Sequence, residues 1–265
     1  MRFQGRPVGI TAVGTYLPPR VMTNEEFAQT LDTSDEWITT RTGIRTRHFA
    51  DPGVCTSDLA LPAARQALER AGLTPADIDL IIVATVTPDT LFPTTANNLQ
   101  AKLGCRPVMS YDLIGACSGF LYALTSAAGM VASGVVNRAL VVGAETMNTI
   151  LDFTDRSTCV LFGDGAGAVV VEATDDDSIG IIDFENYVDG NGGAALCMPA
   201  GGSLRPATHA TVDQRLHYVR QEGQTVFKFA VRNMEEVCRR ILERNQIDPS
   251  AIDLFAAHQA NRRII

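Results

Sequence analysis

The residue with the clearest chemical potential is Cys117, which lies where an apolar segment meets a run of small residues. Residues 107–113 are predicted to form a buried strand, and residues 119–133 a helix rich in Ala, Leu and Met. Gly134 then offers a left-handed cap at little cost. A thiol at the start of a helix faces the positive end of the helix dipole, which favours the thiolate. The pattern predicts a cysteine nucleophile on a tight turn.

Small neighbours on both sides of Cys117 support this interpretation. Gly115, Ala116, Ser118 and Gly119 leave room for a substrate carbonyl and for exposed backbone N–H groups. The alternative is a buried structural cysteine, which is the common role of an isolated one. The other five cysteines lack a comparable turn and are predicted to be structural.

Composition narrows the possible classes of protein. The chain has 265 residues, of which 46% are hydrophobic and 20% charged, and it lacks an apolar run long enough to cross a bilayer. The six cysteines form no CxxC pair and only four histidines are present, which argues against a metal site or a disulfide framework. This cysteine usage and the absence of a visible signal peptide predict a cytoplasmic location. A net charge of −8 argues against nucleic acid as a partner.

An internal repeat predicts the architecture. Residues 68–80 and 242–254 align without a gap, and seven of the thirteen aligned positions are identical. Duplication is a better explanation than chance similarity of two helix–turn–strand units. Strands that alternate with helices predict an α/β fold with a largely parallel sheet in each copy. In the first copy, strands are expected at 8–13, 80–85, 107–113, 139–143 and 166–172, and helices at 57–71, 95–103 and 119–133.

The repeat also predicts two halves, 1–178 and 179–265. The acidic segment 174–177 is the expected link, and residues 179–184 begin the second copy. On the scale of the repeat, the counterpart of Cys117 would fall near position 291, so the sequence is expected to stop inside the second copy.

His258 is the second candidate for chemistry. It follows a predicted strand at 254–257, and its counterpart in the first copy is Ala84, at the carboxyl end of a strand. Ligands of parallel sheets bind beyond the carboxyl ends of strands, and pseudo-symmetry would bring Cys117 and His258 together. A thiol beside an imidazole suits acyl-thioester chemistry, because the cysteine accepts the acyl group and the histidine donates a hydrogen bond. A structural hydrogen-bonding histidine is the alternative.

A third stretch surrounds Trp37, the only tryptophan. Thr33 and Glu36 predict a capping box at the start of a helix, which Gly43 should end. Trp37 and Arg41 are four residues apart and therefore share one face of that helix. Their flat groups could stack on an aromatic base. The alternative places Trp37 in the core and Arg41 in solvent.

Several motifs together resemble the β-ketoacyl-[acyl carrier protein] synthase III family of the thiolase superfamily. This resemblance implies a thiolase-like fold of two duplicated βαβαβαββ halves in α-β-α-β-α layers, with the second half truncated. It also implies a cytoplasmic homodimer that needs no cofactor beyond its thioester substrates. The matching stretches are 33–47, 92–93, 115–120, 154–156, 162–167, 227–228 and 258–265.

The resemblance assigns the chemistry to two residues. Cys117 takes a short acyl primer, such as acetyl, from acyl-CoA. His258 assists the decarboxylation of malonyl-ACP and the Claisen condensation that gives 3-oxoacyl-ACP, the initiating step of fatty acid biosynthesis. The family's third catalytic residue, an asparagine in a Gly-Asn-Thr-Ser loop, has no match here, and Asn261 is not its counterpart. The expectation is therefore a poorly soluble protein that loads acyl groups slowly without condensing them.

Binding roles are implied in the same way. The adenine of CoA would lie between Trp37 and Arg156, and Phe92 would line the acyl pocket from across a dimer interface. The residues implied in CoA binding are Thr33, Trp37, Arg41 and Arg156. Those implied in docking the acidic carrier protein are Lys228, Arg262 and Arg263, reinforced by Arg232, Arg239 and Arg240.

Other functions remain open from the sequence. A degradative thiolase or an enzyme like HMG-CoA synthase would use the same cysteine–histidine pair, although the helix with Trp37 and Arg41 argues against both. A non-catalytic protein that retains the fold is an alternative from another class. A cysteine hydrolase is a weaker alternative, because nothing in the sequence indicates an activated water.

Overall fold

The computed structural model describes residues 5–175 and 180–265, which form two compact units. Unit 1 comprises Met1–Arg20, His48–Thr146 and Gly163–Asn186, and unit 2 comprises Val21–Arg47, Met147–Phe162 and Tyr187–Ile265. The predicted halves 1–178 and 179–265 were defined by the sequence repeat, and they divide the chain differently from these two compact units. Their boundary lies outside the described residues.

Unit 1 is built on a five-stranded sheet. Only the pairs β4–β5 and β4–β6 are parallel, whereas β7 runs antiparallel to both β1 and β6, so the sheet is mixed rather than uniformly parallel. The strand order is β1 (Val8–Tyr16), β7 (Gly165–Ala173), β6 (Arg138–Glu145), β4 (Leu80–Ala84) and β5 (Met109–Leu113).

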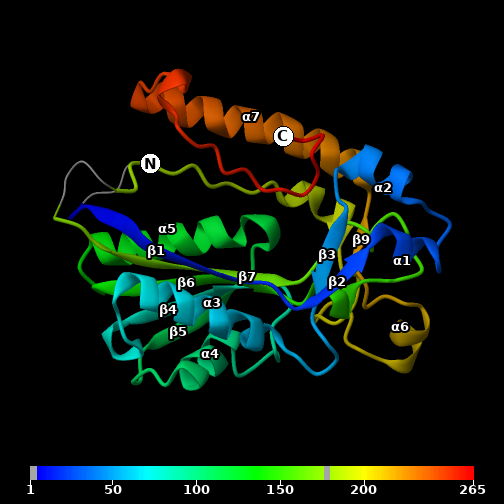
Figure 1. Cartoon of the computed structure of the whole chain (residues 1–265), viewed down its shortest axis with the longest axis horizontal. Helices are drawn as coiled ribbons and strands as arrows, with labels where there is room; N and C mark the ends of the chain where they lie inside the picture. Colours follow the sequence, from blue (N-terminus) through cyan, green and yellow to red (C-terminus); the bar gives the residue numbers. More distant parts are fainter. Residues whose placement is uncertain (1–4, 176–179) are drawn as a thin grey trace. The chain divides into compact units, whose positions relative to one another are not determined.

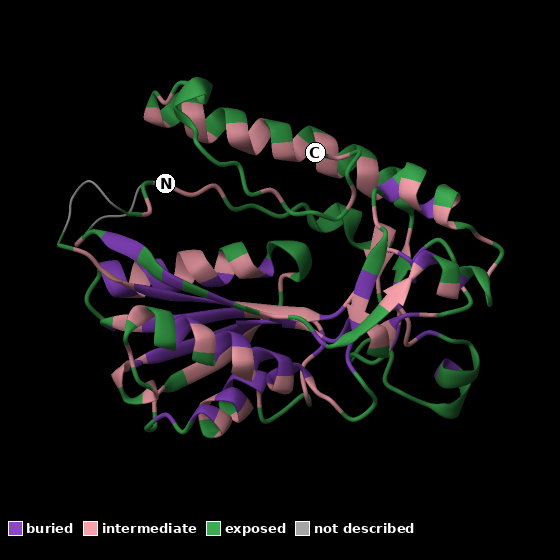
Figure 2. Cartoon of the chain, viewed as in Figure 1, coloured by how far each residue is buried: buried purple, intermediate pink, exposed green. Residues whose placement is uncertain are grey.

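Helices cover both faces of this sheet (Figure 1). The helices α3 (Thr56–Ala71) and α4 (Thr95–Leu103) pack on one face, and α5 (Gly119–Ala132) packs on the other. Successive residues of a strand point to opposite faces, so Ile81 lies in the α3/α4 core and Ile82 in the α5 core. Apolar contact on both faces explains why every residue of β4 is buried (Figure 2).

The predicted elements of the first copy are confirmed, with end shifts of one to three residues. The helix predicted at 95–103 has those bounds in the structure. The helix predicted at 119–133 ends at Ala132, and Gly134 has a left-handed φ of 79°, as expected for a stop signal. Two short 3₁₀ helices, η1 (Pro75–Asp77) and η2 (Ala116–Ser118), complete the described part of unit 1.

Most regular elements of unit 2 are helices, joined by long irregular segments. Its longest element is α7 (Gly223–Asn245), and its short strands β8 (Leu196–Cys197) and β9 (Arg220–Gln221) pair antiparallel. Strands β2 (Arg20–Thr23) and β3 (Thr46–Phe49) form another two-stranded sheet at the junctions of the two units along the chain. The remaining elements are α1 (Asn24–Ala28), α2 (Asp35–Thr42), η3 (Met147–Ile150), η4 (Gly190–Ala195), α6 (His209–Asp213) and η5 (Pro249–Ala251).

The two copies of the repeat fold alike locally. Both α3 and α7 end at a residue with left-handed φ, 67° at Gly72 and 55° at Gln246. A 3₁₀ turn that starts with proline follows each helix. The equivalent helix-ending bonds are Leu73 N to Leu68 O and Ile247 N to Leu242 O, each 2.9 Å. Shared capping geometry at equivalent positions supports the duplication.

The repeat fails at its last element. The strand predicted at 254–257 is wrong, because these residues adopt no regular structure and the side chain of Leu254 is 82% exposed. Residues 181–184 likewise contain only an isolated bridge at Asp183, and residue 179 lies outside the described part. A strand needs a neighbour for its backbone hydrogen bonds, and no described strand of unit 2 pairs with 254–257.

Two glycines of β1 give a matched test of how α3 packs on the sheet. A Cβ at Gly14 would lie 2.0 Å from Ala63 O and 2.6 Å from Ala67 N, whereas a Cβ at Gly9 meets nothing within 4 Å. We expect Gly14→Ala to lower the free energy of unfolding by about 1–3 kcal/mol, because backbone atoms of α3 must move. Gly9→Ala should change it by no more than about 0.5 kcal/mol. Urea denaturation measures both, and equal stabilities would contradict this packing.

Candidate active site

Cys117 lies on a tight turn between β5 and α5, as predicted. The turn passes through the left-handed region at Ala116, which has a φ of 46°. A Cβ at Gly115 would lie 2.8 Å from the Gly119 Cα atom and 3.0 Å from Tyr122 Cδ2, so only glycine fits there. Cys117 is the only exposed cysteine of the six. The small residues thus allow the sharp turn and leave the cysteine accessible.

The electrostatics of the Cys117 thiol differ from the expectation. Although the residue is exposed, the atoms packed around the thiol desolvate it and raise its pKa. A hydrogen bond from the Cys117 backbone N–H lowers the pKa, and the Glu145 carboxylate raises it further. The net direction is upward, so the preference for thiolate expected from the helix dipole is not met. The thiol must lose its proton during the reaction.

Glu145 is a residue that the sequence analysis missed. It ends β6, two residues beyond Gly143, which pairs with Ala84 at the end of β4. Ala84 also pairs with Leu113 at the end of β5, so β4 and β5 end at the same level and β6 extends two residues beyond them. An acidic residue directly after an apolar parallel strand was the available signal.

The predicted CoA-binding residues form a cluster within unit 2. The Arg41 guanidinium carbon lies 4.6 Å from the centre of the Trp37 ring, and the Arg156 guanidinium carbon lies 5.1 Å from it. Arg156 also donates to the backbone oxygen of Asp32 and to its Oδ2 atom, the latter at 3.1 Å. Guanidinium groups and aromatic bases stack on an indole in the same way, so this ring can accept a base.

The start of α2 corrects one prediction. Ser34, not Thr33, caps the helix by accepting a hydrogen bond from Trp37 N at 3.0 Å, and no capping box with Glu36 forms. The helix begins one residue later than expected, at Asp35, and it ends at Gly43 as predicted. The Thr33 hydroxyl is therefore left buried without a hydrogen-bond partner. Buried polar atoms without a partner are rare in folded proteins.

His258 lies in unit 2, and desolvation lowers the pKa of its imidazole although the residue is exposed. The ring is therefore neutral near pH 7 and can donate a hydrogen bond through one N–H. Cys117 belongs to unit 1, so the proximity of these two residues stays a prediction.

The predicted docking residues also lie in unit 2. Arg262 N donates to Thr42 O at 2.9 Å, and the Arg263 guanidinium carbon lies 5.5 Å from the centre of the Phe227 ring, next to Lys228 in sequence. Arg239, by contrast, pairs with Glu236 and Glu243, and Arg240 pairs with Glu236. These two arginines add less positive charge to the surface than the sequence implied.

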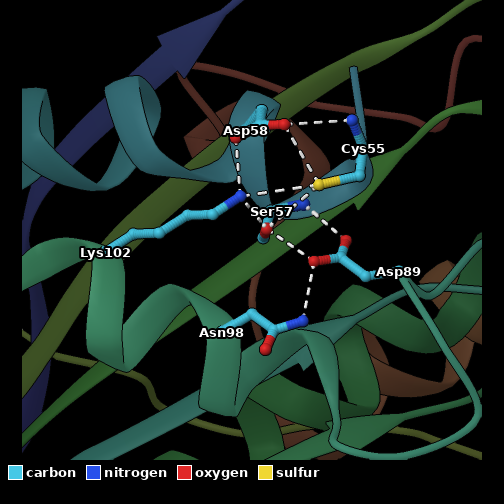
Figure 3. Close-up of polar contacts among 6 residues, drawn as sticks. All are labelled: Cys55, Ser57, Asp58, Asp89, Asn98 and Lys102. Atoms are coloured by element: carbon cyan, nitrogen blue, oxygen red, sulfur yellow. Dashed lines mark hydrogen bonds and ion pairs between the residues drawn. The ribbon is translucent and has the colours of Figure 1, made fainter. Parts of the chain in front are cut away.

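Phe92 lies in the loop that joins β4 to α4, with Leu91 beside it. Both side chains are 84% exposed, which is unusual for large apolar groups. Asp89 anchors this loop, because its carboxylate accepts hydrogen bonds from Ser57 N at 2.9 Å and from Asn98 Nδ2 at 2.9 Å (Figure 3). A fixed loop therefore presents an apolar tip.

Cys55 belongs to the same polar cluster (Figure 3). It lies at the start of α3, and its thiol is 3.1 Å from Asp58 Oδ2 and 3.5 Å from Lys102 Nζ. The hydrogen bond from Lys102 lowers the pKa of Asp58 to about 2. These contacts link α3 to α4, in agreement with a structural role for Cys55.

Among residues 5–175 and 180–265, no group of three or more His, Cys, Asp or Glu side chains is arranged to hold a metal ion. Among the described helices, none combines the length and the apolar character needed to span a bilayer.

Comparisons with known proteins agree on one family. A family model for 3-oxoacyl-[acyl-carrier-protein (ACP)] synthase III matches residues 111–190. A β-ketoacyl-[acyl-carrier-protein] synthase III from Solibacter usitatus is 56% identical over 258 residues, covering 97% of this chain and 78% of the relative. The corresponding protein from Caldanaerobacter subterraneus is 51% identical, covering 97% and 77%.

Solved structures extend the similarity to the fold. The crystal structure of 3-oxoacyl-[acyl-carrier-protein] synthase III from Aquifex aeolicus superposes with a TM-score of 0.86 at 43% identity, covering 97% of this chain and 78% of that one. The enzyme from Pseudomonas aeruginosa gives a TM-score of 0.89 at 40% identity, covering 98% and 77%.

The Trp37 cluster can be tested by fluorescence, because the chain has one tryptophan. We expect free CoA to change the emission of Trp37 in a saturable way, since the adenine would replace a guanidinium on the ring. Arg156→Ala should weaken binding by about 0.5–2 kcal/mol. The matched control is Arg45→Ala, which removes an exposed arginine near the same helix and should leave the affinity unchanged. Equal affinities for both variants would contradict the assignment.

Proposed function

Because this chain belongs to the 3-oxoacyl-[acyl-carrier-protein] synthase III family, we propose that Cys117 and His258 carry that family's reaction here. Enzymes of this family are acyltransferases that condense acyl-CoA with malonyl-ACP to initiate fatty acid synthesis. The observation that supports Cys117 most directly is its position: an exposed thiol on a tight turn at level strand ends.

The first step is acyl loading. The Cys117 sulfur bonds to the acyl carbonyl carbon, the bond from that carbon to the CoA sulfur breaks, and CoA leaves as a thiol. The thiol proton must be transferred during this step, since the pKa of Cys117 is raised. The Cys117 backbone N–H already lies close enough to hydrogen-bond the sulfur, and it is suited to bind the developing oxyanion.

The second step forms the carbon–carbon bond. Malonyl-ACP loses CO₂, and the electrons of that bond form an enolate of the remaining acetyl thioester. A neutral His258 donates a hydrogen bond to the enolate oxygen, which agrees with its lowered pKa. The enolate carbon then attacks the acyl-cysteine, which releases Cys117 and 3-oxoacyl-ACP. Every bond made or broken belongs to a substrate or to Cys117, so the proposed chemistry needs no cofactor.

CoA would bind at the cluster around Trp37. The Arg156 guanidinium already covers the indole ring, so an adenine enters by displacing it and then stacks between the two groups. Arg41 would remain on the ring, and the unpaired Thr33 hydroxyl would supply a hydrogen bond. The support for this site is the convergence of separate segments on one indole.

Unit 1 also supports a homodimer. Among the described strands, β5 pairs only with β4, so its outer edge is free to pair with another chain. Large exposed apolar side chains occur at Ile114, directly after β5, and at Leu91 and Phe92 in the β4–α4 loop. We propose that two copies associate here, with Phe92 reaching the partner's acyl pocket as the family resemblance implies.

The carrier protein would dock on the basic residues of unit 2. Lys228, Arg262 and Arg263 are positively charged in a chain whose net charge is −8. Such a local patch suits an acidic partner because it steers the encounter of the two proteins. We also propose a cytoplasmic location, which the cysteine usage predicts.

The nucleophile can be tested with acetyl-CoA and mass spectrometry. We expect one acetyl group on the peptide that contains Cys117 and none after Cys117→Ala, because the remaining cysteines are buried or half-buried and lie on no comparable turn. The control is Cys55→Ala, which should retain acetylation. Acetylation of another residue in Cys117→Ala would refute the assignment.

The docking role of Arg263 can be tested by measuring the reaction with malonyl-ACP and the acetyl transfer from CoA separately. Arg263→Glu should reduce the rate with malonyl-ACP about tenfold or more at low salt, because electrostatic steering is lost, and less at high salt. Acetyl transfer from CoA should be unaffected. Arg205→Glu makes the same charge change elsewhere in unit 2 and should leave both rates unchanged. Equal loss of both half-reactions in Arg263→Glu would contradict the docking role.

A further inference from the structure

Glu145 is a half-buried acid whose carboxylate is enclosed by one turn of chain. Its Oε1 atom accepts a hydrogen bond from Val86 N at 2.9 Å. Its Oε2 atom accepts hydrogen bonds from the Thr85 hydroxyl at 3.1 Å, from Thr87 N at 3.1 Å and from the Thr87 hydroxyl at 2.5 Å. Both threonines are buried. One carboxylate therefore fixes the turn that follows β4.

This turn and the last residue of β4 lie against the two ends of the loop that carries Cys117. On one side, Thr85 N donates to Leu113 O at 3.2 Å, at the last residue of β5 before the Cys117 turn. On the other side, a Cβ on Gly119, the first residue of α5, would lie 3.5 Å from the Ala84 Cβ atom. A change in the β4 end would therefore move the segment that positions the nucleophile.

The charged and titratable groups near Cys117 in the described part of unit 1 come from three elements. Strand β5 contributes Tyr111 and Asp112, α5 contributes Tyr122, and β6 contributes Glu145. The Asp112 carboxylate already accepts hydrogen bonds from Thr95 N and Ala96 N at 2.7 Å each. Burial raises the pKa of Tyr111. Desolvation is the main cause of the raised pKa of Cys117, and the Glu145 carboxylate raises it further.

The β4–α4 loop is also fixed farther along the chain. Asp89 binds Ser57 and Asn98, as described above (Figure 3). The Thr87 hydroxyl in addition accepts a hydrogen bond from Thr146 N at 2.9 Å. The Thr85–Thr87 turn therefore has few alternative positions while Glu145 stays in place.

We propose that Glu145 is a positioning residue for Cys117, which holds the nucleophile's loop through the Thr85–Thr87 turn and places a carboxylate at the edge of the sheet from which the Cys117 turn leaves. This inference rests on the proposed role of Cys117. Its chemical consequence is selectivity: a thiol kept protonated by desolvation and by a carboxylate reacts slowly with stray electrophiles. It reacts with a bound thioester once the substrate complex assists the loss of its proton.

The charge can be tested through the pH dependence of Cys117 alkylation by iodoacetamide, which requires no CoA substrate. Glu145→Gln removes the charge, so the thiolate should appear at lower pH, and the midpoint should fall by about one pH unit. The matched control is Glu172→Gln, an acid of the same sheet that pairs with Arg138 at 2.8 Å, and its midpoint should equal that of the wild type. An unshifted midpoint in folded Glu145→Gln would overturn the electrostatic part.

The positioning part has its own variants. Glu145→Asp retains the charge but shortens the side chain, and Thr87→Val removes one donor without changing the charge. Both should keep the wild-type alkylation midpoint while acetyl transfer from acetyl-CoA slows about tenfold or more, because the nucleophile is misplaced. Wild-type rates of acetyl transfer in these two variants would overturn the positioning role of Glu145.

Two outcomes remain to be distinguished. If thermal melting shows that Glu145→Gln does not fold, Glu145→Asp and Thr87→Val decide the proposal by the same criteria. If the wild-type protein transfers no acetyl group to Cys117, the proposed function fails. The alkylation midpoints of Glu145→Gln and Glu172→Gln still test the effect of the charge in that case.

Discussion

The parallel pairing of β4 with β5 and β6 is the constraint on which the Cys117 site depends. Its register sets Ala84 level with Leu113 on one side and with Gly143 on the other. Three segments therefore leave the sheet at the same edge: the turn with Cys117, the Thr85–Thr87 turn, and the end of β6 with Glu145. Burial on both faces holds this register, because a slip by one residue would reverse the face of every β4 side chain.

The helix that follows Cys117 depends on the same sheet. Its inner face consists of small residues, including Ala123, Ala127 and Ala128, which are fully buried. Small side chains allow the helix axis to approach the strands closely, and this approach fixes the position of the first turn at Gly119. Packing around the turn also desolvates the thiol. The tight geometry that exposes the nucleophile thus raises its pKa, in opposition to the helix dipole.

Local patterns in the sequence predicted most of unit 1, because its helices and strands have clear periodicity and stop signals. The same patterns gave wrong predictions where the structure of a segment depends on residues that are distant in sequence or on the backbone conformation. Residues 254–257 are apolar enough for a strand but pair with none that the structure describes. Thr33 and Ser34 can both cap a helix, and the backbone at Ser34, extended at φ −147°, decides between them. The role of Glu145 depends on a turn about 60 residues away in sequence, which no local pattern reveals.

We propose that Cys117 and His258 act on one substrate although they belong to different units. The most direct measurement is cross-linking with 1,3-dibromoacetone, whose two bromides can be displaced by a thiol and an imidazole a short distance apart. We expect a linked pair of peptides, one with Cys117 and the other with His258, which His258→Ala removes. Alkylation of Cys117 without a link to His258, or a link to another residue, would show that the two side chains do not share a site.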